Sequence, residues 1–380
     1  MLTYFNVRPG DPSPWFHART IHNPRFAFDT VGGRYIVLCF LGSVAAPRSR
    51  TALGAVLSRS RFFNDETASF FGVSVDPSDE TENRLTHRIP GYRFFLDFDK
   101  ALSRLFGAAP KEPTSVAGVA EMRNLWVVLD PMLRVSAVIP FTEDKSDIPA
   151  LLAYLDALPP PSRFIGFPVQ APILVLPNVF EPEFCSELIA RYERNGGEES
   201  GFVREANGKT ILVHDHSHKR RKDYLIEDQE LIASIQARFV RRVITEIHKA
   251  HQFKASRMER YIVSCYAAED DAHFRAHRDN TTKGTAHRRF AVSVNLNSDF
   301  DGGEVSFPEY GPQGFKAPVG GAVVFSCSLL HAVSQVTRGR RFAFLPFLYD
   351  DAAAKIRSEN NAFLSEEIGQ YEAHRERAAG

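Results

Sequence analysis

The feature that most constrains the fold of this 380-residue chain is a run of short apolar segments between Arg260 and Tyr349. Val, Phe and Tyr are frequent in each segment, and Gly, Pro, Asp and Asn separate one segment from the next. The segments expected as strands are 260–267, 289–296, 303–307, 322–326 and 342–349. Several short strands at close spacing, with no helical period between them, predict an antiparallel barrel or jelly roll.

Three side chains within this run have the chemistry of a metal site. His277 and Asp279 are two residues apart in an extended segment, so they point to the same side and can bind one ion together. His331 follows after about fifty residues and would reach the ion from another strand. Two imidazoles and one carboxylate form the facial triad of non-heme Fe(II) oxygenases. His273 and His287 are rival ligands, but neither has an acidic residue two positions later, so we expect loop or substrate-side roles for both.

A cationic side chain near the end of the run points to a second ligand. Arg341 lies ten residues after His331 and precedes the last apolar segment, so both side chains can point into one barrel. A guanidinium suits bidentate capture of a carboxylate. Iron ligands together with an inward Arg suggest a dicarboxylate co-substrate, with one end on the iron and the other on Arg341. Arg340 is a competitor at an offset of one residue.

Motifs between Pro172 and Tyr349 resemble the prolyl-4-hydroxylase-like 2-oxoglutarate/Fe(II) dioxygenases. The matching pieces are Ser264-Cys-Tyr266, Phe274-x-x-His277-Arg-Asp279, Ser293-Val-Asn295-Leu-Asn297, Asp301-Gly-Gly-Glu304-Val-Ser-Phe307-Pro308, Pro318-x-Gly320-Gly-Ala-Val-Val-Phe325 and His331-x-Val333…Val336-Thr-x-Gly339-x-Arg341. The resemblance covers about half of the chain. It implies a double-stranded β-helix, or jelly roll, with supporting helices.

The resemblance also implies the ligands of each site residue. It places Fe(II) on His277, Asp279 and His331, which are then the catalytic residues. It places the distal carboxylate of 2-oxoglutarate on Arg341, helped by Tyr266 and Asn295. Arg341 is preferred over Arg340 because the family's arginine directly precedes an aromatic residue, here Phe342.

The expected reaction is hydroxylation of an unactivated C–H bond with O2, releasing succinate and CO2. Expected substrates are amino acids, peptidyl residues including prolyl residues, and small molecules, with ascorbate as a reductant for the iron. A carboxylate at Asp279 favours hydroxylation over halogenation, because a halide would need the coordination position that this carboxylate fills.

The first half of the chain alternates between strand and helix patterns, which predicts a sheet flanked by helices. Expected strands are 34–41, 69–76, 92–97, 125–130 and 135–140, and expected helices are 50–62, 79–88, 100–106 and 147–158. The pieces Phe71-Gly-Val-Ser-Val-Asp76, Phe95-Leu-Asp97 and Trp126-Val-Val-Leu-Asp130-Pro resemble the peroxiredoxin branch of the thioredoxin fold.

The first half lacks the thiol that this second resemblance requires. A peroxidase needs a thiolate where the helix after the first central strand begins. That loop, residues 42–50, contains no cysteine, and Ser49 or a neighbour occupies the expected place. Cys39 lies within the strand, where a buried apolar role is simplest. We interpret this half as a redox-inactive scaffold that binds a partner, supports dimerisation or covers the active site.

A proline-rich stretch, residues 158–162, marks the domain boundary. The expected organisation is a peroxiredoxin-like domain over 1–165, an oxygenase domain over 170–352 and a helical tail over 353–380. Patterns at 184–195 and 229–252 predict helices that pack on one sheet of the second domain.

The segment between these helices is rich in histidine and basic residues. His214, His216 and His218 have no fourth ligand nearby, so we expect a polar loop rather than a metal site. The run 219–222 is expected to be a solvated face. Because the segment before the barrel helps to form the substrate entrance in related enzymes, Arg221 and Tyr224 are candidate substrate contacts.

Bulk composition narrows the environment and the partners. Lys plus Arg and Asp plus Glu both number 46, so no net charge attracts the chain to nucleic acid or membrane. Four scattered cysteines argue against a disulfide scaffold. The N-terminal residues lack an apolar signal core, and the longest apolar run, 35–47, is too short to span a bilayer. We expect a cytoplasmic protein, with a small-molecule or peptide substrate, that forms a homodimer.

Two functions of other classes remain open at this point. A thiol peroxidase built on the first domain would consume peroxide by means of a cysteine. A non-catalytic binding module with a relic iron pocket would show no turnover of 2-oxoglutarate, even with Fe(II) and ascorbate present.

Overall fold

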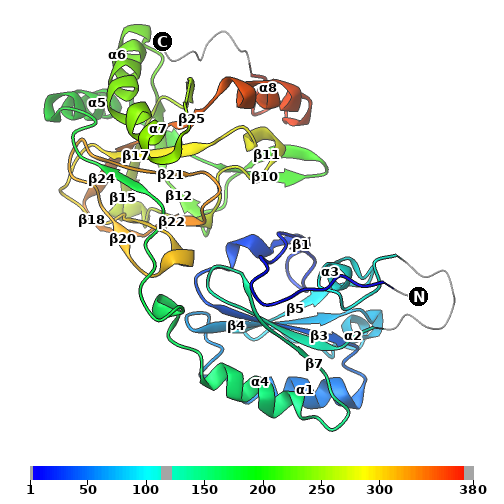
Figure 1. The fold of residues 1–380 in the computed structure, drawn as a ribbon. Coiled ribbons are helices and arrows are strands. Elements are labelled where there is room, and N and C mark those ends of the chain that lie inside the picture. The colour runs from blue at the N-terminus through cyan, green and yellow to red at the C-terminus, as the bar shows by residue number, and fades with distance from the viewer. Residues whose placement is uncertain (1–2, 113–121, 372–380) are drawn as a thin grey trace. The chain divides into compact units, whose positions relative to one another are not determined.

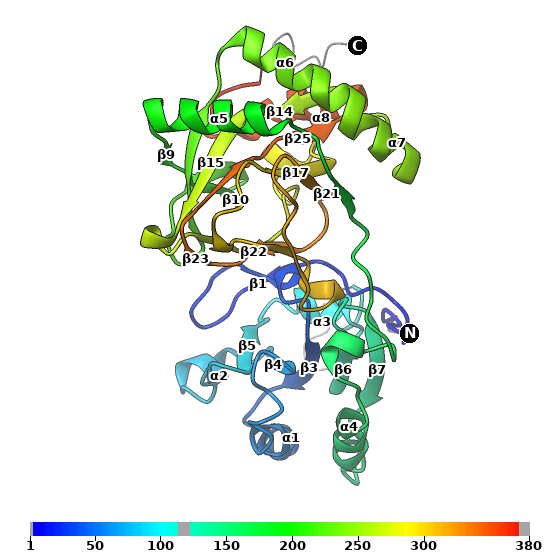
Figure 2. The same ribbon diagram turned by 90° about the vertical axis from the view of Figure 1, so that its left-hand side faces the viewer.

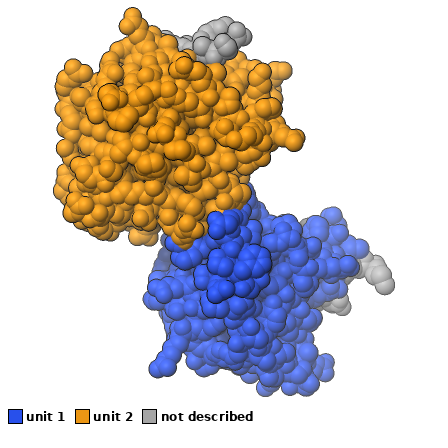
Figure 3. Space-filling view, turned by 60° about the vertical axis from the view of Figure 1, so that its left-hand side comes forward, with its two compact units in different colours: residues 1–170, 308–312 blue, residues 171–307, 313–380 orange. Residues whose placement is uncertain are grey.

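The computed structural model describes residues 3–112 and 122–371. The chain divides into two units, Met1–Gln170 with Pro308–Pro312, and Ala171–Phe307 with Gln313–Gly380 (Figure 3). Each unit has its own sheets and its own core. No helix in the described part of the chain is both long enough and apolar enough to cross a bilayer.

The first unit is built on one five-stranded sheet, in the order β5-β4-β3-β6-β7 (Figures 1 and 2). Its strands are β3 (Tyr35–Gly42), β4 (Ala68–Ser74), β5 (Tyr92–Leu96), β6 (Leu125–Leu129) and β7 (Val135–Pro140). Strands β3, β4 and β5 run parallel, and β6 runs antiparallel to both of its neighbours. The helices are α1 (Pro47–Leu57), α2 (Pro77–Thr81), α3 (Ala101–Leu105) and α4 (Asp147–Asp156).

The apolar run of β3 is continuous because both faces of the sheet are covered. Val37 and Cys39 pack in one cluster with residues of α1 and α4. Ile36 and Leu38 pack in a second cluster, with Leu102 of α3 and several phenylalanines. The helix predicted over 79–88 is wrong in length, because α2 ends at Thr81 and the chain then turns through the left-handed region at residue 83.

A buried carboxylate holds β6 and α4 of the first unit together. Asp147 accepts hydrogen bonds from Trp126 Nε1 at 2.9 Å and from the Thr142 N–H at 3.1 Å, and pairs with Arg48. We expect Asp147→Ala to destabilise this unit by about 3 kcal/mol, because it leaves the Arg48 charge without its buried partner. Both tryptophans of the chain, Trp15 and Trp126, lie in the first unit, so their fluorescence during urea unfolding follows that unit alone.

The pH dependence of this variant gives a second measurement. Burial alone would raise the pKa of Asp147, but hydrogen bonds from Trp126, Thr142 and Arg48 outweigh burial and lower it. The stabilisation is therefore fully present above the unfolded-state pKa, near 3.8, and is lost as the pH falls toward the lower folded-state value. Asp156→Ala is the matched control, since Asp156 pairs with Arg59 on the surface and should change stability little. Equal stability of the two variants at neutral pH would contradict the expectation.

The second unit contains two larger sheets. The first has the path β14-β25-β17-β24-β15-β13-β9, with β21 and β8 attached through β17, and the second has the order β12-β16-β22-β19-β20. The outer strands of the first are β8 (Leu174–Leu176), β9 (Glu198–Glu199), β13 (Lys222–Leu225), β14 (Arg257–Glu259) and β25 (Phe347–Tyr349), and those of the second are β12 (Lys219–Arg220) and β20 (Gly314–Phe315). Central strands of the first sheet are β15 (Ile262–Ala267), β17 (Phe290–Asn295), β21 (Ala322–Ser326) and β24 (Arg340–Phe344). Strands of the second include β16 (His273–His277), β19 (Val305–Ser306) and β22 (His331–Val333).

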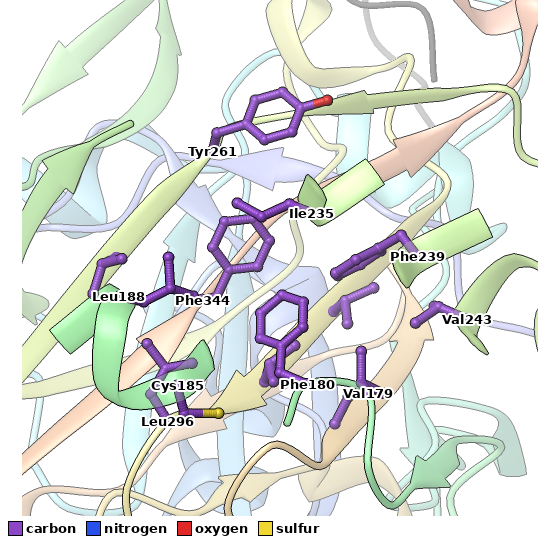
Figure 4. Packing of buried hydrophobic residues seen from close by; sticks show 14 of the residues in the cluster. Val179, Phe180, Cys185, Leu188, Ile235, Phe239, Val243, Tyr261, Leu296 and Phe344 are labelled. Atoms are coloured by element: carbon purple, nitrogen blue, oxygen red, sulfur yellow. The ribbon is translucent and has the colours of Figure 1, made fainter. Parts of the chain in front are cut away.

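Helices cover one face of the larger sheet, and the smaller sheet lies on the other side (Figures 1 and 2). The helices are α5 (Pro182–Asn195), α6 (Gln229–Phe239) and α7 (Thr245–His251), and a π-helical turn over 240–244 joins α6 to α7. Phe180, Phe239 and Phe344 pack ring against ring at the centre of this interface (Figure 4). This core fixes the strands whose opposite faces carry the site.

Several predicted elements differ in detail. The strand predicted over 342–349 is two strands, β24 and β25 (Phe347–Tyr349), because Pro346 cannot donate to a ladder. The hairpin β10 (Phe202–Ala206) and β11 (Lys209–Val213) was not predicted. The C-terminal tail begins with α8 (Asp351–Glu359), and residues 372–380 of the predicted tail lie outside the described residues.

Candidate functional site

Adjacent strands bring His277 and His331 directly opposite each other. His277 ends β16, His331 begins β22, and the two residues are partners in the antiparallel register. Asp279 follows two residues later, where its N–H donates to the carbonyl of Cys327 at 2.9 Å. His277 Nε2 lies 3.5 Å from Asp279 Oδ1, and His331 Nε2 lies 3.3 Å from Asp279 Oδ2. The possible ligand atoms of the three residues all lie within 4.8 Å of one another.

The backbone fixes how both imidazole rings are turned. His277 Nδ1 is 2.7 Å from the carbonyl of Arg275, and His331 Nδ1 is 3.0 Å from the carbonyl of Leu329. A carbonyl only accepts, so Nδ1 carries the proton in each ring and Nε2 keeps its lone pair. Metal-binding histidines are held in the same way, with the second nitrogen donating to a carbonyl or carboxylate. Both Nε2 atoms are directed at Asp279.

The protonation states of this cluster suit a divalent cation. Burial, and then the neighbouring His277, lower the pKa of His331 to about 4, so its imidazole is neutral at pH 7. Burial alone would raise the pKa of Asp279, but His331 and His277 outweigh burial and lower it. Metal binding needs neutral imidazole and ionised carboxylate. Among residues 3–112 and 122–371, no other such group of three His, Cys, Asp or Glu side chains was found.

The other histidines considered as ligands are not part of this group of three, although the ring of His218 lies 6.4 Å from that of His277. His214 and His216 both face Glu199 at the surface, and the expectation of a polar segment there agrees with their exposure. His273 is held by the carbonyl of Asp271 at 2.8 Å. His287 lies in a turn before β17, as a loop position was expected, but its side chain is buried with Nε2 at 3.0 Å from Glu259.

Arg341 is buried on β24 with one donor unused. Its Nε donates to Asn295 Oδ1 at 3.0 Å, and its Nη2 donates to Ser293 Oγ at 2.7 Å. Its Nη1 is buried with no hydrogen-bond partner in the described part of the chain. Buried polar nitrogens normally have a hydrogen-bond partner, so this one indicates a site for a ligand. A carboxylate is the ligand that a guanidinium binds most strongly. Burial lowers the pKa of Arg341 to about 10, so the group stays charged at neutral pH.

The other residues predicted to help bind the co-substrate, Tyr266 and Asn295, both lie beside Arg341. Tyr266 of β15 is its register partner, with the ring centre 5.3 Å from the guanidinium carbon. Asn295 uses Oδ1 for Arg341 and Nδ2 for the carbonyl of Ala317, so its side chain positions the arginine. Arg340 points the other way and pairs with Glu193 at 2.9 Å, with 45% of its side chain exposed.

One pocket of about 480 Å³, open mouth included, joins the histidine cluster to Arg341. Its polar lining residues are Arg221, Arg260, Tyr266, His277, Asp279, Ser293, His331 and Arg341, and its apolar ones include Val305, Phe325 and Phe347. The candidate metal ligands and Arg341, which has the unused donor, therefore line one common pocket.

The solvated face expected for 219–222 is wrong at two positions. Lys219 and Arg221 are buried, whereas Arg220 and Lys222 face outward. The reason is that β12 (Lys219–Arg220) joins the smaller sheet and β13 (Lys222–Leu225) joins the larger one, so alternate side chains turn inward. Tyr224 packs in the helix-covered core and does not line the pocket.

No cysteine of the chain offers an accessible thiol. Cys39, Cys185, Cys265 and Cys327 are all free and buried. Burial raises the pKa of Cys39 well above its ordinary value. Ser49, near the start of α1, donates its hydroxyl to the carbonyl of Leu41 at 2.7 Å. The first unit therefore presents no thiolate for peroxide chemistry.

Comparison with known proteins matches the segment that contains the site to a family model. Residues 261–349 match the model of the 2OG-Fe(II) oxygenase superfamily, and this segment contains His277, Asp279, His331 and Arg341. The second unit thus carries a 2OG-Fe(II) oxygenase domain, and the protein is an oxidoreductase of the dioxygenase (hydroxylase) class. The family implies Fe(II), 2-oxoglutarate and O2, and the predicted resemblance is confirmed.

The individual matches are to hydroxylases and, for the first unit, to peroxiredoxins. The PKHD-type hydroxylase PiuC of Pseudomonas aeruginosa is 26% identical over 182 residues, which is 45% of this chain and 75% of that protein. A prolyl-4-hydroxylase structure from Pseudomonas putida covers 48% of this chain and 94% of its own, at 16% identity and a TM-score of 0.35. Peroxidoxin BcpB from Mycobacterium tuberculosis covers 40% and 99%, at 17% identity and a TM-score of 0.34.

Proposed function

We propose that this protein is a 2-oxoglutarate- and Fe(II)-dependent hydroxylase in which His277, Asp279 and His331 hold the iron. The observation that carries the proposal is the position of the unused Arg341 donor in the same pocket as the three ligands. When bound, the iron and 2-oxoglutarate would supply oxidative decarboxylation to succinate and CO2, with transfer of an oxygen atom from O2 to a substrate C–H bond.

The side chains of the pocket have separate tasks in this proposal. The two histidines and Asp279 fix one face of the metal and leave the other face to the reactants. Arg341 orients the co-substrate through its distal carboxylate, Tyr266 packs against this guanidinium, and Asn295 keeps it aimed. The apolar side chains Phe325 and Phe347 exclude water from the pocket.

The proposal also covers the fold of the second unit, the role of the first unit, the cellular location and the class of substrate. We propose that the two larger sheets of the second unit form a double-stranded β-helix over about 170–352. The first unit, about 1–165, would be a redox-inactive scaffold for a partner, for dimerisation or for covering the active site. Ascorbate would keep the iron reduced in the cytoplasm. The substrate would be an amino acid, a peptidyl residue or another small molecule.

The direct test is succinate formation from 2-oxoglutarate in the presence of Fe(II), O2 and ascorbate, without added substrate. Oxygenases of this kind turn over their co-substrate slowly when uncoupled, whereas a relic binding module would produce no succinate above a metal-free control. Fe(II) affinity by anaerobic calorimetry gives a second readout that does not depend on turnover. Absence of both binding and turnover would overturn the proposal.

Asn295 provides a test of how the co-substrate is positioned. Asn295→Ala leaves Arg341 Nε without its acceptor, so the KM for 2-oxoglutarate should rise by about tenfold. The affinity for Fe(II) should not change, because Asn295 contacts none of the three metal ligands. Succinate formation at varied co-substrate concentration measures the KM, and an equal loss of Fe(II) affinity would indicate general damage to the fold instead.

A further inference from the structure

The pocket contains two guanidinium groups that the co-substrate does not require. Arg221 lies where the chain passes from β12 of the smaller sheet to β13 of the larger one, and Arg260 lies just before β15. Both line the pocket that holds the metal ligands and Arg341. Arg221 donates to Tyr266 Oη at 3.3 Å, and its buried Nε has no hydrogen-bond partner among the described residues.

One carboxylate serves both of these arginines. Asp223 Oδ2 accepts from Arg221 Nη2 at 2.6 Å and lies 3.4 Å from Arg260 Nη2. Asp223 Oδ1 accepts from Ser264 Oγ at 2.6 Å. The wall of the pocket therefore has more positive than negative groups.

Bound iron and 2-oxoglutarate would not neutralise this excess of positive charge. Fe(II) with Asp279 leaves one positive charge, and Arg341 adds a second. The two carboxylates of 2-oxoglutarate balance these two charges. Arg221 and Arg260 against Asp223 then leave at least one positive charge facing a largely enclosed space, where an unbalanced charge is costly.

Arg260 differs from Arg221 in its backbone conformation and in its exposure. Its backbone has φ +65°, a left-handed conformation that is uncommon for a residue with a side chain and often occurs at functional sites. Its guanidinium lies 5.4 Å from the ring centre of Phe347, and 29% of its side chain is exposed, against 3% for Arg221. Arg260 is the accessible member of the pair.

We propose that the substrate of this pocket carries a carboxylate, which Arg260 and Arg221 bind while Asp223 holds the two guanidinium groups in place. This inference rests on the proposed function, because it takes Arg341 to be occupied by 2-oxoglutarate. Two sources share this chemistry, the terminal carboxylate of an amino acid or peptide and the side chain of an acidic residue.

The test uses three small probes that differ in one group. N-acetylglycine has a terminal carboxylate, N-acetylaspartyl amide has a side-chain carboxylate, and N-acetylglycinamide is neutral. Calorimetry measures their binding to the full chain loaded with Fe(II) and 2-oxoglutarate without oxygen. We expect at least one acidic probe to bind about tenfold or more tightly than the neutral one, as one charged hydrogen-bonded contact allows. The acidic probe that binds more tightly shows whether the substrate carboxylate is a terminal one or belongs to an acidic side chain.

Variants connect the preference to these side chains. Arg260→Gln should remove most of the preference while the affinity for 2-oxoglutarate stays within about twofold, because Arg341 is unchanged. Arg221→Lys is a second variant that keeps a charge in the buried position and should weaken the acidic probe through lost geometry. Arg220→Gln is the matched control, since Arg220 points outward to the Asp270 carbonyl and should leave both affinities unchanged.

The outcomes distinguish failure of the carboxylate inference from failure of the proposed hydroxylase function. Equal affinity for acidic and neutral probes, or no binding of any probe, in a protein that still binds Fe(II) and 2-oxoglutarate overturns the carboxylate inference alone. An unchanged preference in Arg260→Gln also overturns it. Failure of the wild-type protein to bind 2-oxoglutarate overturns the proposed function itself.

Discussion

Asp279→Ala should lose iron-dependent succinate formation by about a hundredfold or more. Even a residue that only supports a metal ligand costs 10–100-fold when it is removed, so loss of a ligand should cost at least the upper figure. Asp279 is also the one negative charge of the cluster, lying within 3.5 Å of both Nε2 atoms. Its loss leaves two imidazoles without a carboxylate, which hold Fe(II) weakly. The measurements are succinate production and Fe(II) binding by anaerobic calorimetry.

The control for this experiment is a histidine on the same strand. His273 begins β16, four residues before His277, and contacts the Asp271 carbonyl outside the pocket. His273→Ala should bind Fe(II) and form succinate like the parent protein, whereas His277→Ala should behave like Asp279→Ala. If Asp279→Ala and His277→Ala turn over like the parent, the metal site is misassigned.

Arg341→Met should raise the KM for 2-oxoglutarate by about a hundredfold. A charge-assisted contact to a carboxylate contributes up to about 3 kcal/mol, and each 1.4 kcal/mol is tenfold in affinity. The variant also leaves the polar groups of Ser293 and Asn295 without their shared partner, so its thermal stability should be recorded beside its kinetics. Arg341→Lys should lie between the two, because it keeps the charge and loses the planar geometry.

The adjacent arginine makes a demanding control. Arg340→Met removes the same chemical group one residue earlier, where it pairs with Glu193 at the surface. Its KM for 2-oxoglutarate should stay within about twofold of the parent value, since exposed ion pairs contribute little. A rise in KM for Arg340→Met with none for Arg341→Met would exchange the roles of the two residues.

Local pattern was enough to predict several strands and the pairing of His277 with Asp279. Strand β21 occupies the predicted range 322–326, because a short apolar run between glycines and serine has no helical alternative. The His-x-Asp pair could be predicted because alternation in an extended segment is a local property. One missed element also had a local signal, since Asn207-Gly208 between β10 and β11 is a strong hairpin turn and both residues have positive φ.

Other parts of the site depend on contacts that no short window contains. Lys219 and Arg221 belong to a charged run that is usually solvated, and they are buried because Ser200 and Tyr266 supply partners from other segments. Nothing in the sequence around Arg221 indicates that the chain changes sheets there. The role of Asn295 likewise follows from the inward position of Arg341, which lies 46 residues away.

The state of the cysteines has a consequence for an enzyme that works with dioxygen. Oxidants attack thiolates rather than thiols, and damage follows accessibility. Burial raises the pKa of Cys185 and of Cys265 to about 11 and keeps Cys39 and Cys327 protonated as well. Peroxide formed near the site therefore meets no accessible thiolate in the same polypeptide, because all four cysteines are buried and protonated.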